Sequence, residues 1–293
     1  MANYEGYEVT KIEKSLETKV AVVTLNEPEH RNPLNSLALT ELADIFEEID
    51  EDEEINAVVL TGAGKCFCGG GDIRQLSHIV KGQAFDRLEA RFALRTFFNI
   101  QDCIKPVIAA VQGDAVGGGA NIALHCDIVI MAEDAHLQEL HVPMGLVAGD
   151  GGILWPLQIG LNKAKELVLT GEAITGIEAE RIGLVNHAVP RGKVLPTALA
   201  MAEKLASGPI QAISWTKQIM NKLAHQHREL LTELALSREA LLSVMSEDHK
   251  EAVNAFLEKR PRRYKSKFMG TNVFPRRHLP AGHKISKYGV RED

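Results

Sequence analysis

Two short glycine runs carry the strongest chemical signal in this sequence: CFCGGGDI at residues 66–73 and GDAVGGGAN at residues 113–121. Each run follows an apolar segment with the pattern of a strand and precedes a segment with the pattern of a helix. Glycine leaves the backbone N–H groups of such a turn uncovered, and the positive end of a helix dipole lies behind them. Two turns of this kind that face each other would present two N–H donors to one oxygen, as the stabilisation of a thioester enolate requires.

Phosphate binding is the competing interpretation of a glycine-rich turn, and the spacing disfavours it. A P-loop requires G-x-x-x-x-G-K-[ST], whereas Lys65 is followed by Cys66. Neither run has the G-x-G-x-x-G spacing of a dinucleotide site. Tight packing of a helix on a strand would explain one glycine run without any chemistry, but it does not explain two in this order.

The segment QELHVPMGLVAGDGG, residues 138–152, holds the side chains best suited to move protons. His141 titrates near neutrality and can act as a general acid or base; its alternative role is that of a half-buried structural histidine. Asp150 lies between glycines, and we expect its carboxylate to enter a pocket beside His141. Its alternative role is the N-cap of a helix that begins in GDGGILW. Glu139 is the reserve acid, which shares a face with His141 only if the preceding strand runs that far.

Composition and charge restrict the class of protein. The chain has 293 residues, 45% of them hydrophobic, and a net charge of −6, which is typical of a globular protein. The mild acidity makes nucleic acid an unlikely main partner, and we interpret the acidic run at residues 47–54 as a solvated face. No segment reaches the ~18 apolar residues of a membrane span, and no signal-peptide pattern is present, so we expect a cytoplasmic protein without a membrane partner. The cysteines and histidines lack the spacing of a disulfide framework or a metal site.

A series of strands and helices must position the glycine turns. We expect strands in YEVTKIEK, TKVAVVTLN, NAVVLTG, PVIAAVQG, DIVIMAE and AHLQE. Helices are predicted in GGANIALHC and at residues 36–50, 84–102, 162–170, 176–182, 195–207, 209–223 and 228–258. Asp72 is expected to cap the helix after the first glycine run. The pattern predicts an α/β core at residues 1–200, a helical region at 201–260 and a basic, extended tail at 261–293.

The order of these motifs resembles the crotonase, or enoyl-CoA hydratase/isomerase, family. The resemblance covers about residues 10–263 and rests on RNPLN, VVLTGAGKCFCGGGDI, KPVIAAVQGDAVGGGANIALHCDIVIMAE, GLVAGDGG and EDHKEAVNAFLEKR. It implies a crotonase-like spiral of ββα repeats with a C-terminal helical region that builds homotrimers or dimers of trimers. It also implies an enzyme that acts on an acyl-CoA thioester, with coenzyme A as part of the substrate and no bound prosthetic group.

The resemblance assigns roles to individual residues. The oxyanion donors would be the backbone N–H groups of Gly69 and Gly118. Coenzyme A would be bound around the RNPLN loop and by C-terminal residues, at positions that here hold Arg31, Gly70, Phe256 and Lys259. The resemblance does not identify the acyl group, which depends on a pocket that we expect to be lined by the helix after Asp72 and by residues such as Phe92, Leu94 and Trp155.

The chain departs from a typical hydratase at both catalytic glutamates. Asn121 stands at the first position and His141 at the second. Asn121 cannot act as a base, although its amide can position water or substrate by hydrogen bonds. We therefore expect His141 and Asp150 to replace the glutamate pair in water activation or enolate protonation.

Other functions remain open on the sequence alone. The placement of His141 and Asp150 also resembles a branch of the family that hydrolyses carbon–carbon bonds in β-diketones and needs no coenzyme A. A non-catalytic protein that retains the pocket would bind CoA esters without turnover. The basic segment from Lys259 to Lys287 would contact nucleic acid only as a minor role, because packing on a neighbouring subunit or on CoA phosphate explains it equally well.

Overall fold

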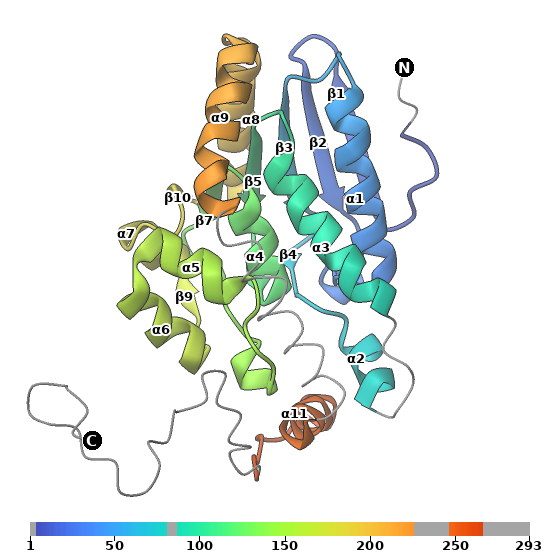
Figure 1. Cartoon of the computed structure of the whole chain (residues 1–293), viewed down its shortest axis with the longest axis vertical. Helices are drawn as coiled ribbons and strands as arrows, with labels where there is room; N and C mark the ends of the chain where they lie inside the picture. Colours follow the sequence, from blue (N-terminus) through green and yellow to red (C-terminus); the bar gives the residue numbers. More distant parts are fainter. Residues whose placement is uncertain (1–3, 81–86, 226–245, 266–293) are drawn as a thin grey trace, which may run out of the picture.

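The computed structural model describes residues 4–80, 87–225 and 246–265, and it contains two β-sheets (Figure 1). The larger sheet has six strands in the order β1-β2-β3-β5-β7-β10. These strands span Thr10–Ser15, Val20–Leu25, Ala57–Gly62, Val107–Val111, Ile128–Ala132 and His187–Val189. β1 and β2 form an antiparallel pair, and each later neighbour in the sheet is parallel. β3 and β5 are buried along their whole length, as expected for parallel strands covered on both faces.

The smaller sheet has four strands in the order β4-β6-β8-β9. They span Cys66–Cys68, Asp114–Val116, His136–Gln138 and Ile174–Thr175. Because β4 follows β3, β6 follows β5 and β8 follows β7, each repeat adds one strand to each sheet, which is the predicted ββα spiral. β4 and β6 are parallel neighbours, so the glycine runs that follow them leave the same edge of the sheet.

Helices cover the sheets; α9 lies at the top of Figure 1 and α11 at the bottom. α1 (Ser36–Glu51) and α3 (Arg87–Asp102) pack side by side, and α8 (Val194–Ala206) packs across β3, β5 and β7. α11 (Glu247–Leu257) packs against α2 (Ile73–Val80) and the 3-10 turn η2 (Val142–Met144). The remaining elements are η1 (Pro28–His30), α4 (Gly118–His125), α5 (Gly151–Ile159), α6 (Leu161–Thr170), α7 (Gly176–Arg181), η3 (Arg191–Lys193) and α9 (Ile210–His225).

Several boundaries differ from those predicted. The long helix expected at 228–258 does not run through Ser246, whose extended backbone (φ −80°, ψ 121°) and side chain cap α11 instead; residues 226–245 lie outside the described part of the chain. The strand predicted in AHLQE ends at Gln138, before Glu139. α5 begins in GDGGILW with Asp150 as its N-cap, which confirms the alternative role considered for Asp150. The short strands β4, β6, β9 and β10 were not predicted.

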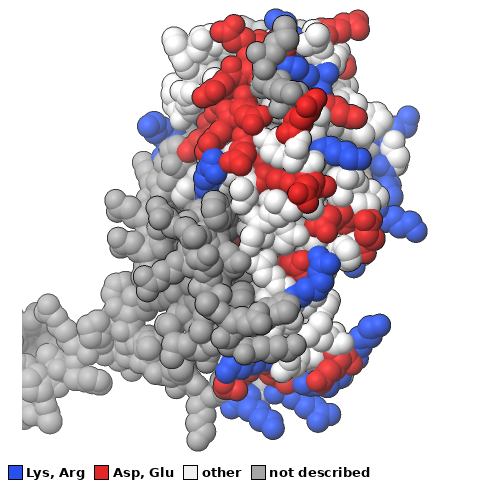
Figure 2. All heavy atoms as spheres, turned by 90° about the vertical axis from the view of Figure 1, so that its right-hand side faces the viewer, with Lys and Arg blue, Asp and Glu red and all other residues white. Residues whose placement is uncertain are grey.

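The acidic run lies at the end of α1 and in the turn that follows it. Glu47 pairs with Arg95 at 2.5 Å, and Asp52 pairs with Lys14 at 2.9 Å. Figure 2, which shows the right-hand side of Figure 1 turned toward the viewer, has acidic side chains gathered over its upper part, with Lys and Arg side chains among them. Glu47, Glu51 and Glu53 are exposed, as predicted for a solvated face, whereas Asp52 is buried.

The cysteines are buried and none forms a disulfide. Among the described residues, no group of His, Cys, Asp and Glu side chains is arranged to hold a metal ion. Within the same ranges, every helix is too short or too polar to cross a bilayer.

Candidate active site

The two glycine turns pack backbone to backbone. Gly70 has φ +85°, and a Cβ atom on it would lie 2.5 Å from the carbonyl oxygen of Val116 and 3.7 Å from the nitrogen of Gly118. A Cβ atom on Gly119 would lie 2.5 Å from the carbonyl oxygen of Cys68. Only glycine permits this approach, which brings the two turns to one place as predicted.

The RNPLN loop holds the first glycine turn through the buried side chain of Asn32. Its Nδ2 donates to the carbonyl oxygens of Cys66 and Phe67 at 2.8 and 3.1 Å. The N–H of Leu34 donates to the carbonyl oxygen of Gly70 at 2.8 Å. The loop therefore fixes the strand β4 and the turn after it as one unit.

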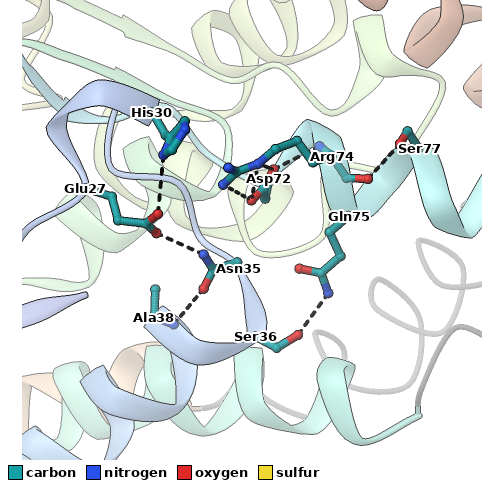
Figure 3. Close-up of polar contacts among 9 residues, drawn as sticks. All are labelled: Glu27, His30, Asn35, Ser36, Ala38, Asp72, Arg74, Gln75 and Ser77. Carbon is teal, nitrogen blue, oxygen red and sulfur yellow. Dashed lines mark hydrogen bonds and ion pairs between the residues drawn. The ribbon is translucent and has the colours of Figure 1, made fainter. Parts of the chain in front are cut away.

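Side chains at the start of α2 complete this support (Figure 3). Asp72 accepts a hydrogen bond from the N–H of Arg74 at 2.8 Å, so it caps α2 as predicted, and it also pairs with the Arg74 guanidinium at 2.6 Å. Burial alone would raise the pKa of Asp72, but these bonds from Arg74 hold it below its ordinary value. Gln75 Nε2 donates to Ser36 Oγ at 2.9 Å and joins α2 to α1.

The structure corrects the assignment of one oxyanion donor. The N–H of Gly69 donates to the carbonyl oxygen of Arg31 at 2.8 Å, so the prediction that Gly69 offers this N–H to a ligand is wrong. The reason is the RNPLN loop, which lies against this side of the turn. Gly71 and Gly118 line the same pocket, and no described residue accepts a hydrogen bond from either N–H. Gly118 is the first residue of α4, where the N–H has no partner within the helix.

One pocket opens between the two turns, and His141 is its one titratable lining side chain among the described residues. The other lining residues are glycine or apolar: Gly69, Gly70, Gly71, Ile73, Leu76, Val116, Gly117, Gly118, Leu140, Met144, Leu146 and Phe256. The structure thus brings Gly69, Gly70, Gly118, His141 and Phe256 together. Asn121, Asp150, Arg31 and Lys259 are not in the lining.

His141 is paired with Glu139. The Oε1 atom of Glu139 contacts Nδ1 of His141 and accepts from its backbone N–H at 3.0 Å. The side chain of Glu139 is fully buried, whereas that of His141 is 16% exposed. Burial alone would raise the pKa of Glu139, but the charge and hydrogen bonds of His141 hold it below its ordinary value. The turn into η2 brings the two residues together, so strand alternation is not the cause.

Asn121 connects Glu139 to Asp150 behind the pocket. Its Nδ2 donates to Glu139 Oε2 at 2.9 Å and to Asp150 Oδ1 at 2.8 Å. Its Oδ1 accepts from Nε1 of Trp155 at 3.3 Å. Trp155 is fully buried and, contrary to expectation, does not line the pocket; the side chains of Phe92 and Leu94 lie outside the description.

The predicted entry of Asp150 into the pocket is wrong. Asp150 is 4% exposed and accepts from the N–H of Gly151 at 3.0 Å, where α5 begins. Burial raises its pKa to about 6, and the nearby charge of Glu139 adds to this effect. The neutral amide of Asn121 therefore lies between two carboxylates. Gly151 gives room for this network, because a Cβ atom there would collide with the Glu139 carboxylate.

Two of the four positions expected to bind coenzyme A line the pocket. Phe256, on α11, is 54% exposed and lines the pocket, as does Gly70. Arg31 adopts a left-handed conformation, with φ +65°, and its exposed side chain pairs with Asp114 at 3.1 Å. Lys259 is exposed just beyond α11.

Comparison with known proteins identifies the family. Residues 15–267 match the sequence model of the enoyl-CoA hydratase/isomerase family, and the chain belongs to this family. It is 38% identical over 246 residues to a putative enoyl-CoA hydratase of Thermus thermophilus, covering 84% of this chain and 97% of the relative. It is 39% identical over 249 residues to a short-chain-enoyl-CoA hydratase of Clostridium acetobutylicum, covering 83% and 93%.

Solved structures agree with this membership. An enoyl-CoA hydratase/isomerase from Mycobacterium paratuberculosis has a TM-score of 0.76 and 34% identity, over 84% of this chain and 97% of that one. A carnitinyl-CoA hydratase from Mycobacterium avium has a TM-score of 0.77 and 34% identity, over 88% and 99%. The fold is therefore the crotonase fold.

Proposed function

We propose that the protein catalyses proton transfer at the α-carbon of an acyl-CoA thioester, as an enzyme of the enoyl-CoA hydratase/isomerase type. The single observation that carries the proposal is the pairing of buried Glu139 with His141, which lines a pocket together with Gly71 and Gly118. An acid–base group and two N–H donors in one apolar pocket are what enolate chemistry needs.

The thioester carbonyl oxygen accepts hydrogen bonds from the N–H groups of Gly71 and Gly118, which stabilise the negative charge of the enolate. His141 has Nδ1 on Glu139, so its Nε2 takes a proton or gives it to the α-carbon. Glu139 holds the ring in this tautomer and stabilises the imidazolium that forms, in the manner of the carboxylate in a catalytic triad. Asn121, which is itself bonded to Asp150 and Trp155, holds Glu139 from behind.

Hydration and isomerisation both fit this machinery. In isomerisation, one group removes a proton from one carbon and returns it to another. In hydration, the same imidazole takes a proton from water and delivers it to the α-carbon, so a second pocket carboxylate is not required. The names of the hydratases from Thermus thermophilus and Clostridium acetobutylicum favour hydration.

Coenzyme A is proposed as part of the substrate. Phe256 and Gly70 would contact it at the pocket, and Arg31 and Lys259 would lie nearer the charged phosphate end of coenzyme A. No prosthetic group takes part in this chemistry. Assembly into trimers and a cytoplasmic location remain predictions. The relatives' names do not favour a β-diketone hydrolase or a non-catalytic binding protein.

The test is α-proton exchange in D₂O, followed by mass spectrometry over a panel of 2-enoyl-, 3-enoyl- and saturated acyl-CoA esters. Exchange by the wild type, with at least a hundredfold loss in His141→Gln, is expected whichever net reaction follows. Addition of water or movement of the double bond then distinguishes hydration from isomerisation. Absence of exchange, addition and isomerisation across the panel would refute the proposal. Turnover of a CoA-free β-diketone would instead identify the protein as a β-diketone hydrolase.

A further inference from the structure

The first turn of α11 packs directly on η2, the turn that begins at His141. Gly145 ends η2 with φ +71°, and a Cβ atom there would lie 2.6 Å from the nitrogen of His249. Ser246 caps α11 by accepting from the N–H of His249 at 3.2 Å. The backbone of α11 therefore approaches η2 as closely as glycine allows.

The side chain of His249 makes a polar contact across this interface. It is fully buried, and its Nδ1 lies 2.7 Å from the carbonyl oxygen of Met144. A carbonyl oxygen only accepts, so Nδ1 carries the hydrogen. Nε2 has no hydrogen-bond partner among the described residues, and an imidazolium would bury a second N–H there without an acceptor. Burial lowers the pKa of His249; the hydrogen bond to Met144 opposes this effect and the charge of His141 adds to it, so the net shift favours the neutral ring.

Backbone hydrogen bonds connect Met144 to His141. The carbonyl oxygen of His141 accepts from the N–H groups of Met144 and Leu146, both at 2.9 Å. Met144 therefore joins the two histidines: its carbonyl oxygen accepts from His249, and its N–H donates to the carbonyl oxygen of His141. Met144 and Leu146 also line the pocket, so a shift of this turn would move part of the pocket wall together with the imidazole.

We propose that His249 is a positioning residue for His141: its Nδ1–H bond to the Met144 carbonyl fixes the η2 turn that places the His141 ring in the pocket. The inference rests on the proposed function for its effect on turnover, but its effect on the His141 ring does not depend on any substrate. Nothing else in the contact between α11 and η2 requires a histidine, because packing alone would be served by an apolar side chain of similar size.

The experiment compares His249→Leu, which keeps apolar volume but loses the donor, with His249→Asn, whose amide N–H can occupy the Nδ1 position. The control Ser246→Ala removes the cap of the same helix and leaves the His249–Met144 bond in place. Ring ¹⁵N–¹H correlations of His141, assigned with His141→Gln, report its environment without substrate. kcat, KM and the melting temperature are measured for each full-length variant.

His249→Leu should shift the His141 ring signals and lower kcat at least tenfold, with KM changed less than threefold. His249→Asn should restore the signals and bring kcat to within threefold of wild type. Ser246→Ala should lower the melting temperature and leave kcat within twofold. If His249→Leu does not fold, His249→Gln, whose amide is displaced from the Nδ1 position, takes its place.

Unmoved His141 signals in His249→Leu would overturn the inference, as would equal losses of kcat in the Leu and Asn variants. A loss of kcat in Ser246→Ala as large as that in His249→Leu would mean that docking of α11, and not the bond of His249, controls turnover. That result would also overturn the inference. If the wild type turns over no acyl-CoA, the proposed function fails while the ring signals still decide the role of His249.

Discussion

The Oε1 atom of Glu139 binds both the ring Nδ1 and the backbone N–H of His141, two positions along the chain. A carboxylate with two bonds to one residue fixes the side chain and the backbone of that residue together. Glu139 is itself held by the Nδ2 of Asn121 at 2.9 Å. The imidazole of His141 is therefore supported from inside the protein, and its orientation does not depend on the substrate.

Glu139→Gln tests this pairing. The amide retains the volume of the carboxylate but removes the negative charge that stabilises protonated His141, so kcat should fall by about 10- to 1000-fold. His141 should then lose its proton at lower pH, and the low-pH limb of kcat/KM should move to lower pH. Glu172→Gln, at an exposed position, is the matched control. An unchanged kcat and pH profile in Glu139→Gln would exclude the role of the pair.

The order of strands and glycine turns was predictable because it depends on local patterns. Apolar runs identify the strands, and a glycine triplet after a strand identifies a turn with bare backbone. The edge where the turns meet follows once β4 and β6 are parallel neighbours. The same local reasoning placed the cap of α2 at Asp72.

The choice among glycines and the partner of His141 were not predictable in this way. The N–H of Gly69 donates to the carbonyl oxygen of Arg31, a residue far away in sequence, and no local pattern reveals that contact. Glu139 reaches His141 because the strand ends at Gln138 and the chain turns. One signal was available: a glycine at position 151 makes room for a buried carboxylate, although the sequence alone does not say which one.

The Gly71 amide can be tested with a matched pair of variants, Gly71→Ala and Gly71→Pro. A Cβ atom on Gly71 would meet only Leu76 Cδ1, at 3.8 Å, so a small side chain fits. Alanine keeps the N–H and proline removes it. If this N–H stabilises the enolate, kcat of the proline variant should lie about 100- to 1000-fold below that of the alanine variant. If both variants have native circular dichroism spectra and equal kcat values, the N–H of Gly71 does not stabilise the enolate.

Phe256 should contribute to substrate binding more than to chemistry. Its ring lines the pocket from α11 while remaining 54% exposed, so a ligand can cover it. Phe256→Ala should raise KM for acyl-CoA about tenfold, which corresponds to ~1.4 kcal/mol of lost burial, with a much smaller change in kcat. Leu257→Ala removes a neighbouring, 47% exposed side chain outside the pocket lining and serves as the control. Equal KM values for both variants would place the ligand elsewhere.

Asp150→Asn should remove a contribution to stability that depends on pH in the wild type. The pKa of Asp150 in the folded protein is about 6, above the ordinary value of 3.8, because the carboxyl is buried. Its ionisation therefore opposes folding: the stability of the neutral acid is present below pH 3.8 and is lost as the pH rises through 6. The amide oxygen of the variant can still accept from Asn121 and Gly151, and it carries no charge.

The variant should therefore exceed the wild type in free energy of unfolding by on the order of 3 kcal/mol at pH 8, and the difference should vanish near pH 4. Urea unfolding at a series of pH values between these limits measures it. Turnover should fall less than in Glu139→Gln, because Asp150 reaches the Glu139–His141 pair through Asn121. A difference that stays constant with pH, or a wild type that is more stable at pH 8, would mean that Asp150 is ionised at little cost. Its position behind the pocket would then need another explanation.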